Sequence, residues 1–177
     1  MNRTLLNRIT QNAVLLALTC LVGMFSIPLG ANVKVSLQFL AILLVSFLSF
    51  SWVDSLIISL CYLLLGLFLP FYAGFSAGIS PTFGFVAGFV VAAPVISLLN
   101  RLKLKWWLRM GIAGLAGLLI VYIAGTAFMM VYLSWGLGET LLVSVVPYIP
   151  FDIAKIVLAV LLGHRLEIAL KREPKEE

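Results

Sequence analysis

The chain has 177 residues, of which 63% are hydrophobic and only 11% are charged, and its formal net charge is +5. Soluble domains are about 45–50% apolar and about 25% charged, and a domain of this size keeps too much of its surface exposed to hide such an apolar composition from water. The composition therefore excludes an ordinary soluble domain and predicts an integral membrane protein.

Six apolar segments follow one another along the chain, and each is a predicted membrane helix. They cover residues 12–29, 36–51, 54–70, 81–99, 110–134 and 145–164. A run of about 20 apolar residues is long enough to cross a hydrocarbon core of about 30 Å as a helix. We therefore expect an all-α integral membrane protein with six transmembrane helices. We expect it to form a single six-helix transmembrane domain over residues 1–177, with a charged cytoplasmic tail from about 165 to 177.

The lysines and arginines predict how the chain is oriented. Cytoplasmic loops of membrane proteins carry an excess of these residues. If the N-terminus is cytoplasmic, Lys34 alone falls in an outer loop and Lys155 lies inside a segment, whereas all the others face inward: Arg3, Arg8, Arg101, Lys103, Lys105, Arg109, Arg165, Lys171, Arg172 and Lys175. Both termini are therefore predicted to be cytoplasmic. The basic loop anchors this topology, with contact to anionic membrane lipid or to a cytoplasmic partner as the alternative, and we expect no nucleic-acid partner.

Two further polar residues lie near predicted helix ends. Asp54 falls at the cytoplasmic boundary between the second and third segments, where it can reach water or cap the start of the third helix. His164 is placed in the last turn of the sixth segment, where a helix C-terminus favours a cation. We expect a structural role for both residues.

The stretch YIPFDIAK, from Tyr148 to Lys155, places an acid and a base inside the sixth apolar segment. Proline is tolerated in the first turn of a helix and poorly further inside, so Pro150 predicts that the helix begins near Tyr148 to Phe151. The 15 residues from Pro150 to His164 would make a helix about 22 Å long, which is short for a full span. The first turn should therefore lie in a recess below the outer surface.

Asp152 and Lys155 allow two interpretations. A first-turn carboxylate is favoured by free backbone N–H groups and the helix dipole, and a lysine three residues later lies on the same face. Each charge costs about 2.5–3.5 kcal/mol at mid-membrane depth. Either the two side chains satisfy each other and only fix the helix, or they form a polar patch for a ligand. In the second case Asp152 accepts from ligand N–H groups and Lys155 donates to a carboxylate or carbonyl.

The predicted outer loop and helix start from Leu69 to Phe89 are rich in glycine, aromatic and hydroxyl side chains. The candidate ligand contacts here are Tyr72, Ser76, Ser80, Thr82 and Phe85. Flat apolar surface with a few hydroxyls suits a small ligand that has an apolar body and polar handles. The alternative is a packed loop whose glycines only let helices approach closely.

The motifs of this region resemble a known family. The stretch YLLLGLFLPFYAGFSAGISPTFGFVAGF, Tyr62 to Phe89, is similar to the biotin-specific substrate-binding subunits of energy-coupling factor (ECF) transporters, the BioY family. Members carry Tyr-Leu-Leu-Leu-Gly, then Leu-Pro, Ala-Gly and a Pro-Thr-x-Gly motif. Two further matches are Ser36-Leu37-Gln38 and Pro150-x-Asp152-x-x-Lys155. The resemblance extends in order over nearly the whole chain.

The resemblance implies an S component that encloses biotin near the outer face of the bacterial plasma membrane. It implies substrate contacts from Asp152 and Lys155, with Gln38 and the loop residues named above. Phe85 stands where the family usually has tyrosine. A related carboxylate vitamin such as lipoate is therefore an alternative ligand.

The resemblance also implies partners. The family docks on a transmembrane coupling subunit of the EcfT type, served by two ATPase subunits, through an Ala-x-x-x-Ala patch that corresponds to Ala13 and Ala17. The chain has no G-x-x-x-x-G-K-[ST] loop of its own for ATP. We expect no catalytic residues, cofactor or metal site, and thus no enzyme. An independent secondary carrier is the other alternative.

Overall fold

Helices account for most of the described residues in the computed structural model, which describes residues 3–28 and 34–171. The elements in order are α1 (Arg3–Met24), β1 (Ser26–Pro28), β2 (Lys34–Ser36), α2 (Gln38–Leu48), α3 (Trp52–Phe68), α4 (Phe83–Leu99), α5 (Trp106–Leu133), α6 (Leu137–Ser144), a 3-10 turn η1 (Val146–Tyr148) and α7 (Ile149–Lys171). The six predicted membrane helices correspond to α1, α2, α3, α4, α5 and α7. The short helix α6 and the small antiparallel β1–β2 hairpin were not predicted.

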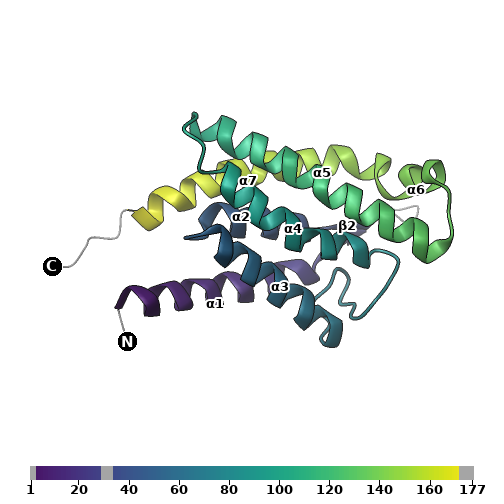
Figure 1. Ribbon diagram of the computed structural model, residues 1–177, viewed down its shortest axis with the longest axis horizontal. Helices are drawn as coiled ribbons and strands as arrows, with labels where there is room; N and C mark the ends of the chain where they lie inside the picture. Colours follow the sequence, from purple (N-terminus) through teal and green to yellow (C-terminus); the bar gives the residue numbers. More distant parts are fainter. Residues whose placement is uncertain (1–2, 29–33, 172–177) are drawn as a thin grey trace.

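The helix axes lie roughly along one direction, so the molecule has two distinct ends (Figure 1). One end, which we call the basic end, holds the start of α1, the end of α7 and the connections α2–α3 and α4–α5. The other, the loop end, holds the β hairpin, the long loop over residues 69–82 and α6. The start of α1 and the end of α7 thus share one end, as an even number of spans requires.

Helix α2 lies at the centre of the bundle. Nine of its 11 residues are buried, and the core around it draws on α4, α5 and α7 through side chains such as Ile96, Met110 and Ile156. A helix that is apolar on all sides is stable only when neighbours cover every face. This explains why α2 can be short and still sit in the middle of a membrane protein.

Glycines allow α4 and α5 to pack closely. A Cβ atom added to Gly88 would lie 3.1 Å from both Cβ of Ala124 and Cα of Val121, and at Gly84 it would overlap Phe128. In the loop, by contrast, Gly74 and Gly78 adopt φ angles of 73° and 80°, which side chains disfavour. The glycines of this region therefore serve both helix packing and loop geometry.

Three helical stretches are long and apolar enough to cross a membrane by length and composition: Leu5–Met24, Trp106–Leu133 and Leu137–Ala169. The other three main helices, α2, α3 and α4, are apolar but have only 11–17 residues. The protein is therefore a helical membrane protein that combines three long apolar stretches with three shorter apolar helices.

The ends of the first and last helices differ from the prediction. Helix α1 begins at Arg3, and α7 continues to Lys171. His164 is thus not in the last turn, and residues 165–171 of the predicted tail are helical, while residues 172–177 lie outside the described part. The prediction placed each helix end where the sequence becomes polar, which marks the edge of the hydrocarbon. The helical backbone hydrogen bonds continue past that edge in both α1 and α7. The ring of His164 stacks on Trp106, with ring centroids 3.9 Å apart.

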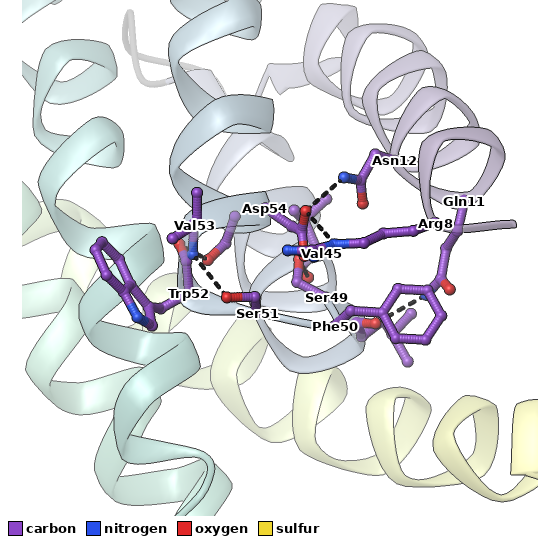
Figure 2. Close-up of polar contacts among 12 residues, drawn as sticks. Arg8, Gln11, Asn12, Val45, Ser49, Phe50, Ser51, Trp52, Val53 and Asp54 are labelled. Carbon is purple, nitrogen blue, oxygen red and sulfur yellow. Dashed lines mark hydrogen bonds and ion pairs between the residues drawn. The ribbon is translucent and has the colours of Figure 1, made fainter. Parts of the chain in front are cut away.

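Asp54 also differs from its predicted role. The helix cap is Ser51, whose hydroxyl accepts from the Val53 N–H at 3.3 Å. Asp54 is 3% exposed and forms an ion pair with Arg8 at 2.8 Å, while Asn12 donates to it at 2.8 Å (Figure 2). The carboxylate turns to α1 because a guanidinium and an amide there replace the water that it would otherwise need. It therefore fixes α1 to α3 at the basic end.

Candidate functional site

The charged pair of the last helix lies at the loop end of the bundle. Helix α7 begins at Ile149 with Pro150 in its first turn, as predicted, so Asp152 also falls in the first turn. Nζ of Lys155 lies 2.6 Å from Oδ1 of Asp152, and the two side chains are only 9% and 10% exposed. An acid and a base are therefore buried together where the helix dipole favours the acid.

A third side chain completes this group. The hydroxyl of Tyr122, in α5, donates to Oδ2 of Asp152 at 2.7 Å. Both carboxylate oxygens are thus occupied, which lowers the cost of burying the charge. Tyr122 was missed from the sequence, although a phenol inside the apolar run LLIVYIAG is itself a signal that a polar partner lies nearby. We call Tyr122, Asp152 and Lys155 the charged triad.

The triad keeps unused hydrogen-bonding capacity. A lysine ammonium carries three N–H donors, and within the described part of the chain Asp152 is the only hydrogen-bond partner of Lys155. The structure has the self-satisfied pair that one interpretation predicts. It also leaves two donors of Lys155 without a described partner, which is the feature that the ligand interpretation requires.

A second polar group lies at the same end of the bundle. Gln38 donates to the Tyr62 hydroxyl at 2.7 Å, and that hydroxyl donates to the Phe71 carbonyl at 3.0 Å. Tyr72 donates to the Leu63 carbonyl at 2.6 Å, and its ring lies edge-on to Tyr62 with centroids 5.8 Å apart. Burial raises the pKa of Tyr72 to about 12, so its hydroxyl remains neutral at physiological pH. These contacts hold the start of the long loop against α2 and α3.

The remaining loop candidates lie nearer the surface. Ser76 is exposed and donates to the Ala73 carbonyl at 3.0 Å, and the hydroxyls of Ser80 and Thr82 lie 3.1 Å apart. Phe85 is half-buried, with its ring against Gly125 of α5. No hydrogen bond or ring contact among the described residues joins this group to the charged triad, so a shared site remains a prediction.

The predicted docking residues lie on an open face of α1. Ala13 and Ala17 are exposed, and so are the large apolar side chains Val14, Leu18 and Leu21. An exposed face with small residues four positions apart lets another helix approach closely.

Metal-binding side chains do not cluster in the described part of the chain. Residues 3–28 and 34–171 contain no group of three His, Cys, Asp or Glu side chains that could bind a metal ion.

Comparison with known proteins gives three matches. A family model described as "BioY family" matches residues 1–172. Over 86 residues the chain is 35% identical to a Thermotoga maritima protein described as "Biotin transporter BioY"; this match spans 48% of each chain, about half the length of that relative.

A solved structure is similar over nearly the whole length. It is described as the S-component for biotin from an ECF-type ABC transporter, and it matches with a TM-score of 0.82 and 25% sequence identity over 94% of both chains. The family match covers all but the last five residues of the sequence. The chain therefore belongs to the BioY family.

Proposed function

We propose that the chain is the substrate-binding component of an ECF-type vitamin transporter and captures biotin at its loop end. Two comparisons support this proposal. The relative from Thermotoga maritima is described as a biotin transporter, and the similar solved structure is described as an S-component for biotin. We also propose that the loop end faces outward from a bacterial plasma membrane and that both termini are cytoplasmic.

The observation that carries the proposal is the buried charged triad. Biotin has a carboxylate and a ureido group with N–H donors and a carbonyl acceptor. The two donors of Lys155 that have no partner among the described residues suit the carboxylate or the carbonyl, and Asp152 suits the ureido N–H groups. A ligand that supplies both kinds of group replaces water around a charge pair that is costly to bury alone.

The loop residues would close over the ligand. Tyr72 and Gln38 hold the loop base, and Phe85 offers an aromatic face for an apolar ring. The hydroxyls of Ser76, Ser80 and Thr82 lie on the loop itself. In this proposal loop opening admits the vitamin, and the bound vitamin then stabilises the closed loop.

Uptake requires partners. We propose that Ala13 and Ala17 receive a transmembrane coupling subunit of the EcfT type, and that two ATPase subunits supply the energy. The chain itself then binds and delivers its substrate without catalysing a reaction.

The test is equilibrium binding of radiolabelled biotin to the purified protein in detergent, with unlabelled biotin and lipoate as competitors. The proposal predicts saturable binding of one biotin per chain and weaker competition by lipoate. Absence of saturable binding would contradict the proposal, and equal or stronger competition by lipoate would assign the site to that vitamin instead.

A further inference from the structure

A hollow lies at the opposite end of the molecule from the charged triad. It has a volume of about 720 Å³ and lies between the start of α5 and the last turns of α7. Its lining comes from Trp106, Leu161, Leu162, His164, Arg165, Ile168 and Ala169. We call these residues the basic-end groove. Five of the seven are apolar, counting Trp106, and the other two are His164 and Arg165, so the groove presents a largely apolar wall with one permanent cation.

The ends of two apolar stretches indicate that the groove lies near the level where membrane meets water. Two stretches long enough to span a membrane, Trp106–Leu133 and Leu137–Ala169, both end there. Tryptophan is enriched at this depth because its ring is apolar and its N–H is polar. Trp106 is held in place by its stack on His164, at 3.9 Å and an interplanar angle of 6°. The groove therefore has a rigid aromatic wall at the height of lipid headgroups.

Arg165 lines the groove, and two lysines precede its wall residue Trp106 in the chain. Arg165 is exposed, and Lys103 and Lys105 are exposed just before Trp106. None of these three cations forms an ion pair with another residue in the described part of the chain. The nearest acid along α7, Glu167, is two positions from Arg165 and so points to another face, where Arg109 binds it at 2.7 Å. These three cations are thus available to an anion.

We propose that the basic-end groove binds one anionic glycerophospholipid of the surrounding membrane. An acyl chain lies along Leu161 and Leu162, toward the membrane interior, and the phosphate lies by Arg165 and Lys105. The apolar wall contacts the acyl chain and does not distinguish an anionic lipid from a zwitterionic one. Selectivity for the anionic headgroup therefore comes from the unpaired cations. This site is independent of biotin binding, because it uses the other end of the bundle.

The test is native mass spectrometry of the delipidated full-length protein, titrated with phosphatidylglycerol or with phosphatidylcholine of the same acyl chains. We expect the first phosphatidylglycerol to bind at least about fivefold more tightly, the effect of one basic side chain near an anionic headgroup. Arg165→Gln should remove most of this preference, and Trp106→Leu should weaken the binding of both lipids.

Two matched variants serve as controls. Arg101→Gln removes an equal charge from the same end but outside the groove, and Trp107→Leu removes an exposed neighbour that does not line it. Both should bind phosphatidylglycerol as the wild type does. Equal affinity of the wild type for the two lipids, or equal losses in Arg165→Gln and Arg101→Gln, would overturn the proposal.

Discussion

The Tyr122 hydroxyl donates to Oδ2 of Asp152 at 2.7 Å, across 30 residues of sequence, and so joins α5 to the first turn of α7. Lys155 occupies the other oxygen of the same carboxylate. The tyrosine therefore fixes the carboxylate while Lys155 keeps donors in reserve. Because Tyr122 and Lys155 contact different oxygens of Asp152, substitution of each residue tests a different contact.

The first prediction concerns Tyr122 as a positioning residue. Tyr122→Phe removes one hydrogen bond to a charged acceptor, an interaction worth about 1.5–3 kcal/mol, and leaves Lys155 as the one described residue that holds the Asp152 carboxylate. We expect biotin affinity to fall at least about tenfold while the protein remains folded. Tyr132→Phe, on the exposed side of the same helix, is the control. Unchanged affinity in Tyr122→Phe would separate the tyrosine from the site.

The second prediction concerns the stability of the buried pair. Asp152→Asn and Lys155→Met each leave one buried charge without its partner, which should lower the free energy of unfolding by about 3–5 kcal/mol. The double variant leaves no unpaired charge and should recover most of that loss without recovering biotin binding. Thermal unfolding in detergent measures the first effect and ligand binding the second. A double variant as unstable as the singles would show that the pair does not act as a unit.

The third prediction concerns helix packing. At Gly84 an added Cβ would overlap Phe128 and lie 2.9 Å from the Ala124 carbonyl, whereas Gly111 has nothing within 4 Å of that position. Gly84→Ala should therefore destabilise the protein by about 1–3 kcal/mol, and Gly111→Ala should stabilise it by up to about 1 kcal/mol. The unfolding temperatures of the two variants should move in opposite directions. Shifts of the same sign would contradict the packing described for α4 and α5.

The fourth prediction concerns the docking face. Replacing both Ala13 and Ala17 by leucine adds bulk to an exposed face of α1 and should prevent a partner helix from approaching closely. Co-purification with the coupling subunit should then be lost, while biotin affinity stays at the wild-type value. Ala127→Leu, at an exposed alanine of α5, should co-purify normally. Undiminished assembly of the double variant would place the interface elsewhere.

The sequence predicted the parts of the fold that depend on local pattern. The order of the six main helices follows from hydropathy, and the start of α7 follows from Pro150, because proline favours a first turn. Helix α6 was missed because its eight residues, LGETLLVS, are too few to cross a membrane. Their apolar side chains also give no hydropathy signal separate from the apolar segments on either side. The extensions of α1 and α7 were missed because charge marks the membrane boundary and not the helix boundary.

The ion pairs that join helices at the basic end could not be predicted, because they link residues distant in sequence. Arg8 and Asp54 are 46 positions apart, and Arg109 and Glu167 are 58 positions apart. Asp54 and Glu167 both lie near predicted helix ends. From the sequence, water could solvate each carboxylate there as well as a basic side chain could. By contrast, Asp152 and Lys155 are three positions apart on one helix, so their pairing could be derived from helix geometry alone.

The most direct test of the charged triad as the biotin site compares two ion pairs at opposite ends of the bundle. Lys155→Met breaks the pair with Asp152, and Arg109→Met breaks the more exposed, part-buried pair with Glu167. Biotin affinity is measured for both purified variants under conditions in which each remains folded. We predict that Lys155→Met loses at least about a hundredfold, or 2.7 kcal/mol, and that Arg109→Met retains the wild-type affinity. Wild-type affinity in Lys155→Met would contradict the account.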